Sequence, residues 1–198
     1  NSAVLLQPDG AFHGKYYKTH LVPFGEYVPL KQFLPFIAPL VQAVGDFSTG
    51  TVEQPLPWQG ARSGILICYE SVFPELSRQW VKAGANVLIN LTNDAWYGKS
   101  SAPYHSLAMA VLRAVETRRS LIRSANTGIS AFISPTGMIE LQSEVFVPFA
   151  ATRSVSLLQG ETFWVRYGHF FAPACLFLGL LTGGSAVNYR LILNGGTL

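Results

Sequence analysis

The segment Gly64-Ile65-Leu66-Ile67-Cys68-Tyr69-Glu70 decides the fold, because a short apolar run meets polar residues at Cys68. That pattern is typical of a buried strand that delivers a side chain to the edge of a sheet. A lone cysteine in an apolar run is more often a small core residue than a nucleophile. The residues around Cys68 therefore have to decide between the two interpretations.

Outward from this strand, the hydrophobic pattern predicts an α/β sheet with helices packed on it. Residues 63–69 and 87–91 read as buried strands, and residues 74–83 and 102–118 read as helices. Pro74 suits a first helical turn, and Gly84 suits the end of that helix. The remaining expected strands are a hairpin of residues 2–7 and 13–22 around Pro8-Asp9-Gly10, and short strands near 120–125, 128–134, 137–142 and 152–158.

The composition limits the partners. Hydrophobic residues make up 49% of the 198 residues and charged residues only 13%, so we expect part of the chain to meet lipid or a large partner. The net charge is +3 without a basic run, which argues against nucleic acid as a partner. Two cysteines and four histidines without metal-ligand spacing predict no metal site, and no cofactor motif is present.

Two segments look suited to a membrane. Residues 167–189 contain no Lys, Arg, Asp or Glu, and as a helix they would measure about 34 Å, enough to cross a bilayer core. We expect a transmembrane helix with a short tail over residues 161–198, the alternative being a buried core helix. Residues 30–44 form either an apolar lid, in which Phe33, Leu34, Phe36 and Ile37 enter the bilayer, or an irregular core segment.

Cys68, Lys18 and a carboxylate together suggest acyl transfer through a thioester. A thiolate is favoured by a nearby cation or a helix N-terminus, and Lys18 is the candidate cation. The lysine ammonium and the backbone N–H of Tyr69 would hold the oxyanion of a tetrahedral intermediate. A general base is still required to move the proton, and glutamate is the usual choice.

The motifs resemble one family. Residues 18–29 (KTHLVPFGEYVP), followed by Ile67-Cys68-Tyr69-Glu70, resemble apolipoprotein N-acyltransferase, the membrane-bound branch of the nitrilase (carbon-nitrogen hydrolase) superfamily. Residues 93–98 (NDAWYG), 113–116 (RAVE) and 123–130 (RSANTGIS) are similar to its later motifs, and Tyr167-Gly168 matches the approach to its last membrane helix.

The resemblance implies the second half of a nitrilase-like αββα sandwich, here residues 1–160, followed by the transmembrane helix. It also implies an enzyme of the bacterial inner membrane whose site faces the periplasm. The acyl donor would be a phospholipid, usually phosphatidylethanolamine, and the acceptor the N-terminal cysteine amine of a diacylated lipoprotein. By motif match Cys68 is the nucleophile, Lys18 the catalytic lysine and Glu26 a glutamate that holds the lysine, while Tyr69 and Glu70 shape the site.

The chain departs from the family pattern at the general base. The family's glutamate precedes the lysine by many residues, whereas none of the seventeen residues before Lys18 is Glu. We therefore expect a piece cut from a longer polypeptide that is inactive alone. Two alternatives stay open: a nitrilase-type amidase that hydrolyses small amides, and an inactive fragment that binds lipid.

Other polar residues allow two interpretations. Asn93, Asp94 and Trp96 either contribute to the site or form a capped turn after a strand, and Trp96 and Tyr97 are candidates for the lining of an acyl entrance. His20 either assists the site or hydrogen-bonds within its own loop. Structural roles are favoured for two further sets: ion pairing among Arg113, Glu116, Arg118 and Arg119, and a tight turn at Asn126 and Gly128.

Overall fold

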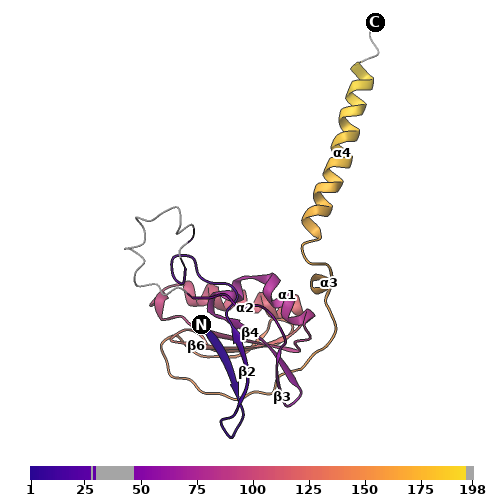
Figure 1. The fold of residues 1–198 in the computed structure, drawn as a ribbon. Helices are drawn as coiled ribbons and strands as arrows, with labels where there is room; N and C mark the ends of the chain where they lie inside the picture. The colour runs from indigo at the N-terminus through magenta and orange to yellow at the C-terminus, as the bar shows by residue number, and fades with distance from the viewer. Residues whose placement is uncertain (28, 30–46, 195–198) are drawn as a thin grey trace.

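A computed structural model describes residues 1–27, 29 and 47–194 (Figure 1). The apolar segment at 30–44, with Phe33, Leu34, Phe36 and Ile37, lies outside the described residues.

The chain begins with the expected hairpin. Strands β1 (Ser2–Leu6) and β2 (Phe12–Tyr17) pair antiparallel, with Ser2 opposite Tyr17. The Asp9 carboxylate accepts a hydrogen bond from Ala11 N, and Gly10 takes a positive φ of 84°, which is the geometry that this turn requires. The second strand ends at Tyr17, before the predicted residue 22, so Lys18 lies immediately after it.

A six-stranded mixed sheet forms the centre of the domain, in the order β3-β4-β5-β6-β7-β8. The strands β4, β5 and β6 are parallel neighbours, and the other pairs are antiparallel. The bounds of the strands are β3 (Leu56–Trp58), β4 (Ala61–Ile67), β5 (Val87–Asn93), β6 (Ser120–Asn126), β7 (Ala131–Ile133) and β8 (Ile139–Gln142).

The sequence pattern was wrong about one strand and missed another. Residues 152–158 form no strand, although Val155 and Leu157 favour one, because this segment is held by isolated hydrogen bonds such as Leu158 N to Asn86 O (3.3 Å). The three-residue strand β3 lies in a stretch rich in proline and glutamine that gave no strand signal.

Helices α1 (Pro74–Lys82) and α2 (Ala102–Thr117) pack on one face of the sheet (Figure 1). Trp80 of α1 is buried, and its indole N–H donates to Ile65 O (2.7 Å). A Cβ at Gly64 would lie 2.8 Å from Trp80, so the glycine allows α1 to approach the sheet this closely. Helix α2 ends one residue earlier than predicted, because Arg118 takes a left-handed conformation.

Beyond the sheet, a short helix α3 (Phe163–Tyr167) leads into α4 (Phe171–Asn194), which projects away from the domain (Figure 1). The expected C-terminal helix therefore forms, but it begins at Phe171 because Gly168, with a φ of 62°, ends α3. Phe171 is 80% exposed and Leu180 67%, so the alternative of a buried core helix is wrong for this part of α4.

Over residues 1–27, 29 and 47–194, no helix combines the length and the hydropathy that a membrane crossing requires.

Candidate active site

Cys68 lies at the point where β4 gives way to a tight turn. The strand ends at Ile67, one residue before the cysteine, and Cys68 opens the 3₁₀ turn η2 (Cys68–Val72). Its φ is 54°, an unfavourable conformation for a residue with a side chain. Such strain is found at functional sites, where the surrounding structure holds a residue in an unusual direction. Cys68 is a half-buried free thiol.

Lys18 is held by the Glu26 carboxylate. The lysine is 1% exposed, and its Nζ donates to both oxygens of Glu26 at 2.8 Å. Glu26 Oε2 also accepts from Val22 N (2.9 Å), which fixes the carboxylate within its own loop. An ammonium group has three N–H donors, so one donor of Lys18 remains beyond the two that Glu26 accepts.

Glu70 joins the lysine segment to the cysteine segment. Its side chain is fully buried, and Oε1 accepts hydrogen bonds from Thr19 N (2.6 Å), His20 N (3.0 Å) and the Tyr16 hydroxyl (2.9 Å). The other oxygen, Oε2, accepts from Ile67 N (2.7 Å). One carboxylate thus bonds the residue directly after Lys18 and the residue directly before Cys68, and this holds the two segments against each other.

Two residues that bond Glu70, Tyr16 and His20, also have side chains with defined surroundings. Burial, and secondly the charge of Glu70, raise the pKa of Tyr16 well above its usual range. The His20 ring stacks on Phe73 with centroids 4.3 Å apart. His20 thus has structural contacts outside its own loop, because its backbone N–H bonds Glu70 and its ring packs on Phe73.

A partly buried ion pair on α2 supports the turn that carries Cys68. Arg113 donates to Glu116 through two hydrogen bonds of 2.8 Å, as the sequence pattern suggested. Nη1 of Arg113 also donates to Ser71 O (3.2 Å) and Val72 O (2.8 Å), at the end of η2. Arg118 and Arg119 lie beyond the end of α2, and Arg119 bonds backbone carbonyls of other segments instead.

A second ion pair, which is fully buried, was not predicted from the sequence. Arg123 of β6 donates to Asp94 Oδ2 (2.8 Å) and Ser106 Oγ (2.9 Å), and it also bonds Asn90, its register neighbour on β5. Burial lowers the pKa of Arg123, while Asp94 opposes that shift. The available signal was an arginine within a buried strand, because such a residue needs a buried partner.

The loop that follows β5 places Tyr97 and Trp96 differently. A cavity of about 270 Å³ contains Cys68 and Tyr97 in its wall, together with Tyr69, Val72, Ser101, Ala102, His105, Ser106 and Met109. Burial, and secondly the charge of Cys68, raise the pKa of Tyr97. Trp96 is 87% exposed and does not line this cavity.

Asn93 has a local role in the structure. Its Oδ1 accepts hydrogen bonds from Ala95 N and from the Asn126 amide, both at 3.2 Å. These contacts match the capped-turn interpretation, and Asn93 is not part of the cavity wall. A larger cavity of about 1150 Å³, between β2, residues 49–57 and α1, contains none of the predicted site residues.

The fold and the site define a class of protein. The model of the carbon-nitrogen hydrolase family matches residues 1–143, and the chain belongs to this family. Solved relatives include a carbon-nitrogen hydrolase from Helicobacter pylori, with 19% identity and a TM-score of 0.54 over 73% of this chain and 52% of that chain. An amidase from Nesterenkonia has 24% identity and a TM-score of 0.53, over 73% and 51%. These similarities support the nitrilase-like fold.

Curated relatives are more similar in sequence. An apolipoprotein N-acyltransferase of Geobacter metallireducens is 50% identical over 176 residues, which are 89% of this chain and 34% of the relative. Another, of Bdellovibrio bacteriovorus, is 36% identical over 96% of this chain and 36% of its own length. The chain spans about a third of the curated relatives that it matches. The resemblance deduced from the motifs is thereby confirmed.

Proposed function

We propose that the protein is an acyltransferase that moves an acyl chain from a phospholipid, through a thioester on Cys68, to the N-terminal cysteine amine of a diacylated lipoprotein. The Glu70 carboxylate is the observation that supports this most, because it bonds the Lys18 segment and the Cys68 segment together. The names of the curated relatives supply the substrate classes. Phosphatidylethanolamine is the proposed donor.

The proposed reaction has two halves. In the first, a base takes the proton of the Cys68 thiol, the thiolate attacks the ester carbonyl, the C–O bond breaks, and the base returns the proton to the oxygen of the leaving lysophospholipid. In the second, the lipoprotein amine attacks the thioester, the C–S bond breaks, and the amine proton passes to a base. The remaining N–H of Lys18 and the backbone N–H of Tyr69 would stabilise both oxyanions.

The base itself is proposed to lie outside the described residues. Three candidate carboxylates in the part of the chain that the structure describes, those of Glu26, Glu70 and Asp94, already have partners. Glu26 is paired with Lys18, Asp94 is paired with Arg123, and Glu70 accepts four hydrogen bonds. We therefore propose a glutamate that precedes the lysine in the full-length protein, and no turnover by residues 1–198 alone.

A hybrid protein tests the need for this base. Residues 1–198 would replace the matching third of the Geobacter metallireducens relative, so that the preceding part of that protein is present. The hybrid should turn over, and residues 1–198 in the same detergent should not. Activity of the 198 residues by themselves would refute the proposed base.

The proposed location is the bacterial inner membrane, with the site on the periplasmic side. The apolar side chains Leu176, Phe177, Leu178, Leu180 and Leu181 of α4 are more than half exposed, as a lipid-facing helix requires. We propose that residues 161–198 are the membrane anchor and residues 1–160 belong to the catalytic domain.

The direct test is transfer to a defined acceptor. The full-length protein would be incubated in detergent with phosphatidylethanolamine and a diacylated lipopeptide that begins with cysteine. The expected product is the triacylated lipopeptide, absent with the variant Cys68→Ala. Hydrolysis of small amides without transfer would favour the amidase alternative, and lipid binding without either reaction would favour the inactive fragment.

A further inference from the structure

The segment that leads into α4 is hydrogen-bonded to several parts of the domain. We call residues 156–168 the strap. It is held by bonds from Ser120 Oγ to Ser156 O (2.9 Å), Leu158 N to Asn86 O (3.3 Å), Arg119 Nη2 to Gly160 O (2.6 Å), and Thr162 Oγ1 to Glu116 O (2.6 Å). Val165 is fully buried. The strap is therefore part of the domain surface, although α4 projects away from it (Figure 1).

Arg78 of α1 holds the end of the strap nearest to α4. Its Nε donates to Val165 O (2.8 Å) and Trp164 O (3.2 Å), and its Nη2 to Arg166 O (3.4 Å). These carbonyls belong to α3, a helix of five residues that is too short to be stable alone. A cation that bonds the free carbonyls at a helix end stabilises that end.

Gly168 shows how closely Arg78 fits this junction. The residue has a φ of 62°, and a Cβ there would lie 3.1 Å from the Arg78 guanidinium carbon. A side chain at position 168 would thus meet backbone strain and the guanidinium at once. Arg78 is also fixed on its other side by Glu75 Oε1, 2.7 Å from Nη1.

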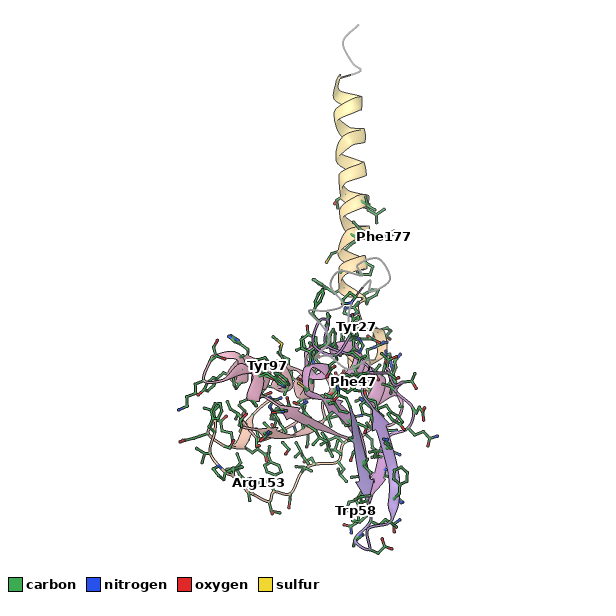
Figure 2. The ribbon with its side chains drawn as sticks, turned by 60° about the vertical axis from the view of Figure 1, so that its left-hand side comes forward. Tyr27, Phe47, Trp58, Tyr97, Arg153 and Phe177 are labelled. Atoms are coloured by element: carbon green, nitrogen blue, oxygen red, sulfur yellow. The ribbon has the colours of Figure 1, made fainter. Side chains whose placement is uncertain are left out.

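The strap and the cysteine turn share one part of α2. Thr162 bonds the backbone of Glu116, the Glu116 side chain pairs with Arg113, and Arg113 bonds the carbonyls of Ser71 and Val72. The strap, which leads into α4, and the turn that carries Cys68 are thus both bonded to helix α2. In Figure 2, Tyr27 and Tyr97 lie toward the end of the domain from which α4 projects, and Trp58 and Arg153 lie toward the opposite end.

We infer that Arg78 is a positioning residue that sets how the Cys68 cavity meets an acyl donor held in a membrane. The inference rests on the proposed function. Arg78 bonds helix α3, which leads directly into α4. Loss of the Arg78 side chain therefore lets the domain tilt relative to an α4 that is held in a membrane. The chemistry at Cys68 is left intact, since Arg78 does not touch the site. A donor dissolved in water does not depend on that orientation, so the two kinds of donor separate this role from a structural one.

The experiment compares two donors with one full-length protein in phosphatidylethanolamine vesicles. Acylation of Cys68 is followed by intact mass, first from the vesicle lipid and then from a short-chain, water-soluble p-nitrophenyl ester. With Arg78→Ala we expect the lipid rate to fall on the order of tenfold, because small misplacements have large effects on rate, while the ester rate stays within about twofold. Arg78→Lys should recover part of the lipid rate, since lysine places one donor without the guanidinium fork.

Arg166→Ala is the matched control, because Arg166 lies in the strap, is exposed, and pairs with Glu161 at 3.6 Å. It should leave both rates unchanged. Equal losses on both donors with Arg78→Ala, or no loss on either, would overturn the inference. If Arg78→Ala does not fold, the same two rates are compared in Arg78→Lys. A loss confined to the lipid donor supports the inference, and equal losses or no loss overturn it. Acylation of the wild type by the ester but not by the lipid would refute the proposed donor, and the inference with it.

Discussion

Glu70→Gln tests whether the Glu70 carboxylate acts as a clip between the Lys18 and Cys68 segments. A glutamine has the same shape but only one acceptor oxygen. If that oxygen faces the three donors at Oε1, the amide NH₂ faces Ile67 N–H, 2.7 Å from the present Oε2. The backbone N–H of Ile67 is then opposed by another donor and left unsatisfied next to Cys68.

The expected cost follows from that one lost bond. An unsatisfied buried donor costs about 1–3 kcal/mol. Weaker bonds at the other oxygen are offset by the loss of a buried charge, which is itself costly. For a domain of 150–250 residues, about 1–3 kcal/mol corresponds to a melting temperature that is lower by roughly 2–12 °C. Acylation of Cys68 should fall on the order of a hundredfold if Lys18 moves by about 1 Å.

Thermal unfolding and intact-mass acylation of the full-length protein measure the two effects. Glu53→Gln is the control, because that carboxylate is exposed, and its effect should stay within about 0.5 kcal/mol. An unchanged melting temperature together with a wild-type rate of acylation would refute the proposal that the Glu70 carboxylate holds the Lys18 and Cys68 segments together. Unchanged melting with lost acylation would show that Glu70 acts in the chemistry, as a base.

Three further predictions follow from the same contacts. Lys18→Ala should abolish acylation of Cys68 by removing an oxyanion donor, and Lys18→Arg should restore little, because Glu26 binds a compact ammonium; acylation at the wild-type rate in either variant would contradict this role. Gly128→Ala should destabilise the domain by about 2–5 kcal/mol, measured by denaturant unfolding, since its Cβ would collide with the Asp94 carboxylate that pairs with Arg123; an unchanged midpoint would mean that this pair can shift freely. The pKa of Tyr16 is raised in the folded state, whereas the tyrosine of the unfolded state ionises at about pH 10. The stability that Tyr16 contributes should therefore be complete below about pH 10. It should be lost as the pH rises further, because the folded state then binds more protons than the unfolded state. Tyr16→Phe should flatten this alkaline loss in pH-dependent unfolding, and a loss as steep as in the wild type would assign it to another group.

The sequence was most informative where one pattern had one physical outcome. The apolar runs that form β4 and β5 are typical of buried strands, so both strands and the position of Cys68 near a strand end were predictable. The motif that contains Lys18 and Glu26 placed an ammonium and a carboxylate eight residues apart, and the loop between them brings the two charges together at 2.8 Å.

The rest depended on contacts between segments far apart in the chain. Arg78 bonds residues 164–166, and Arg123 bonds Asp94, and neither partner can be identified from spacing. Residues 152–158 have strand propensity but form no ladder with a described strand, so the tertiary environment overrode that propensity. Trp96 was expected at an acyl entrance, yet only its neighbour Tyr97 lines the cavity that contains Cys68.

The most direct test of the account is the intact mass of the full-length protein in detergent after incubation with phosphatidylethanolamine. The account predicts a gain of one acyl chain on Cys68 that hydroxylamine removes, as it does for thioesters, and no gain in Cys68→Ala. No gain in a folded protein whose Cys68 is reduced would contradict the proposed acyl-enzyme.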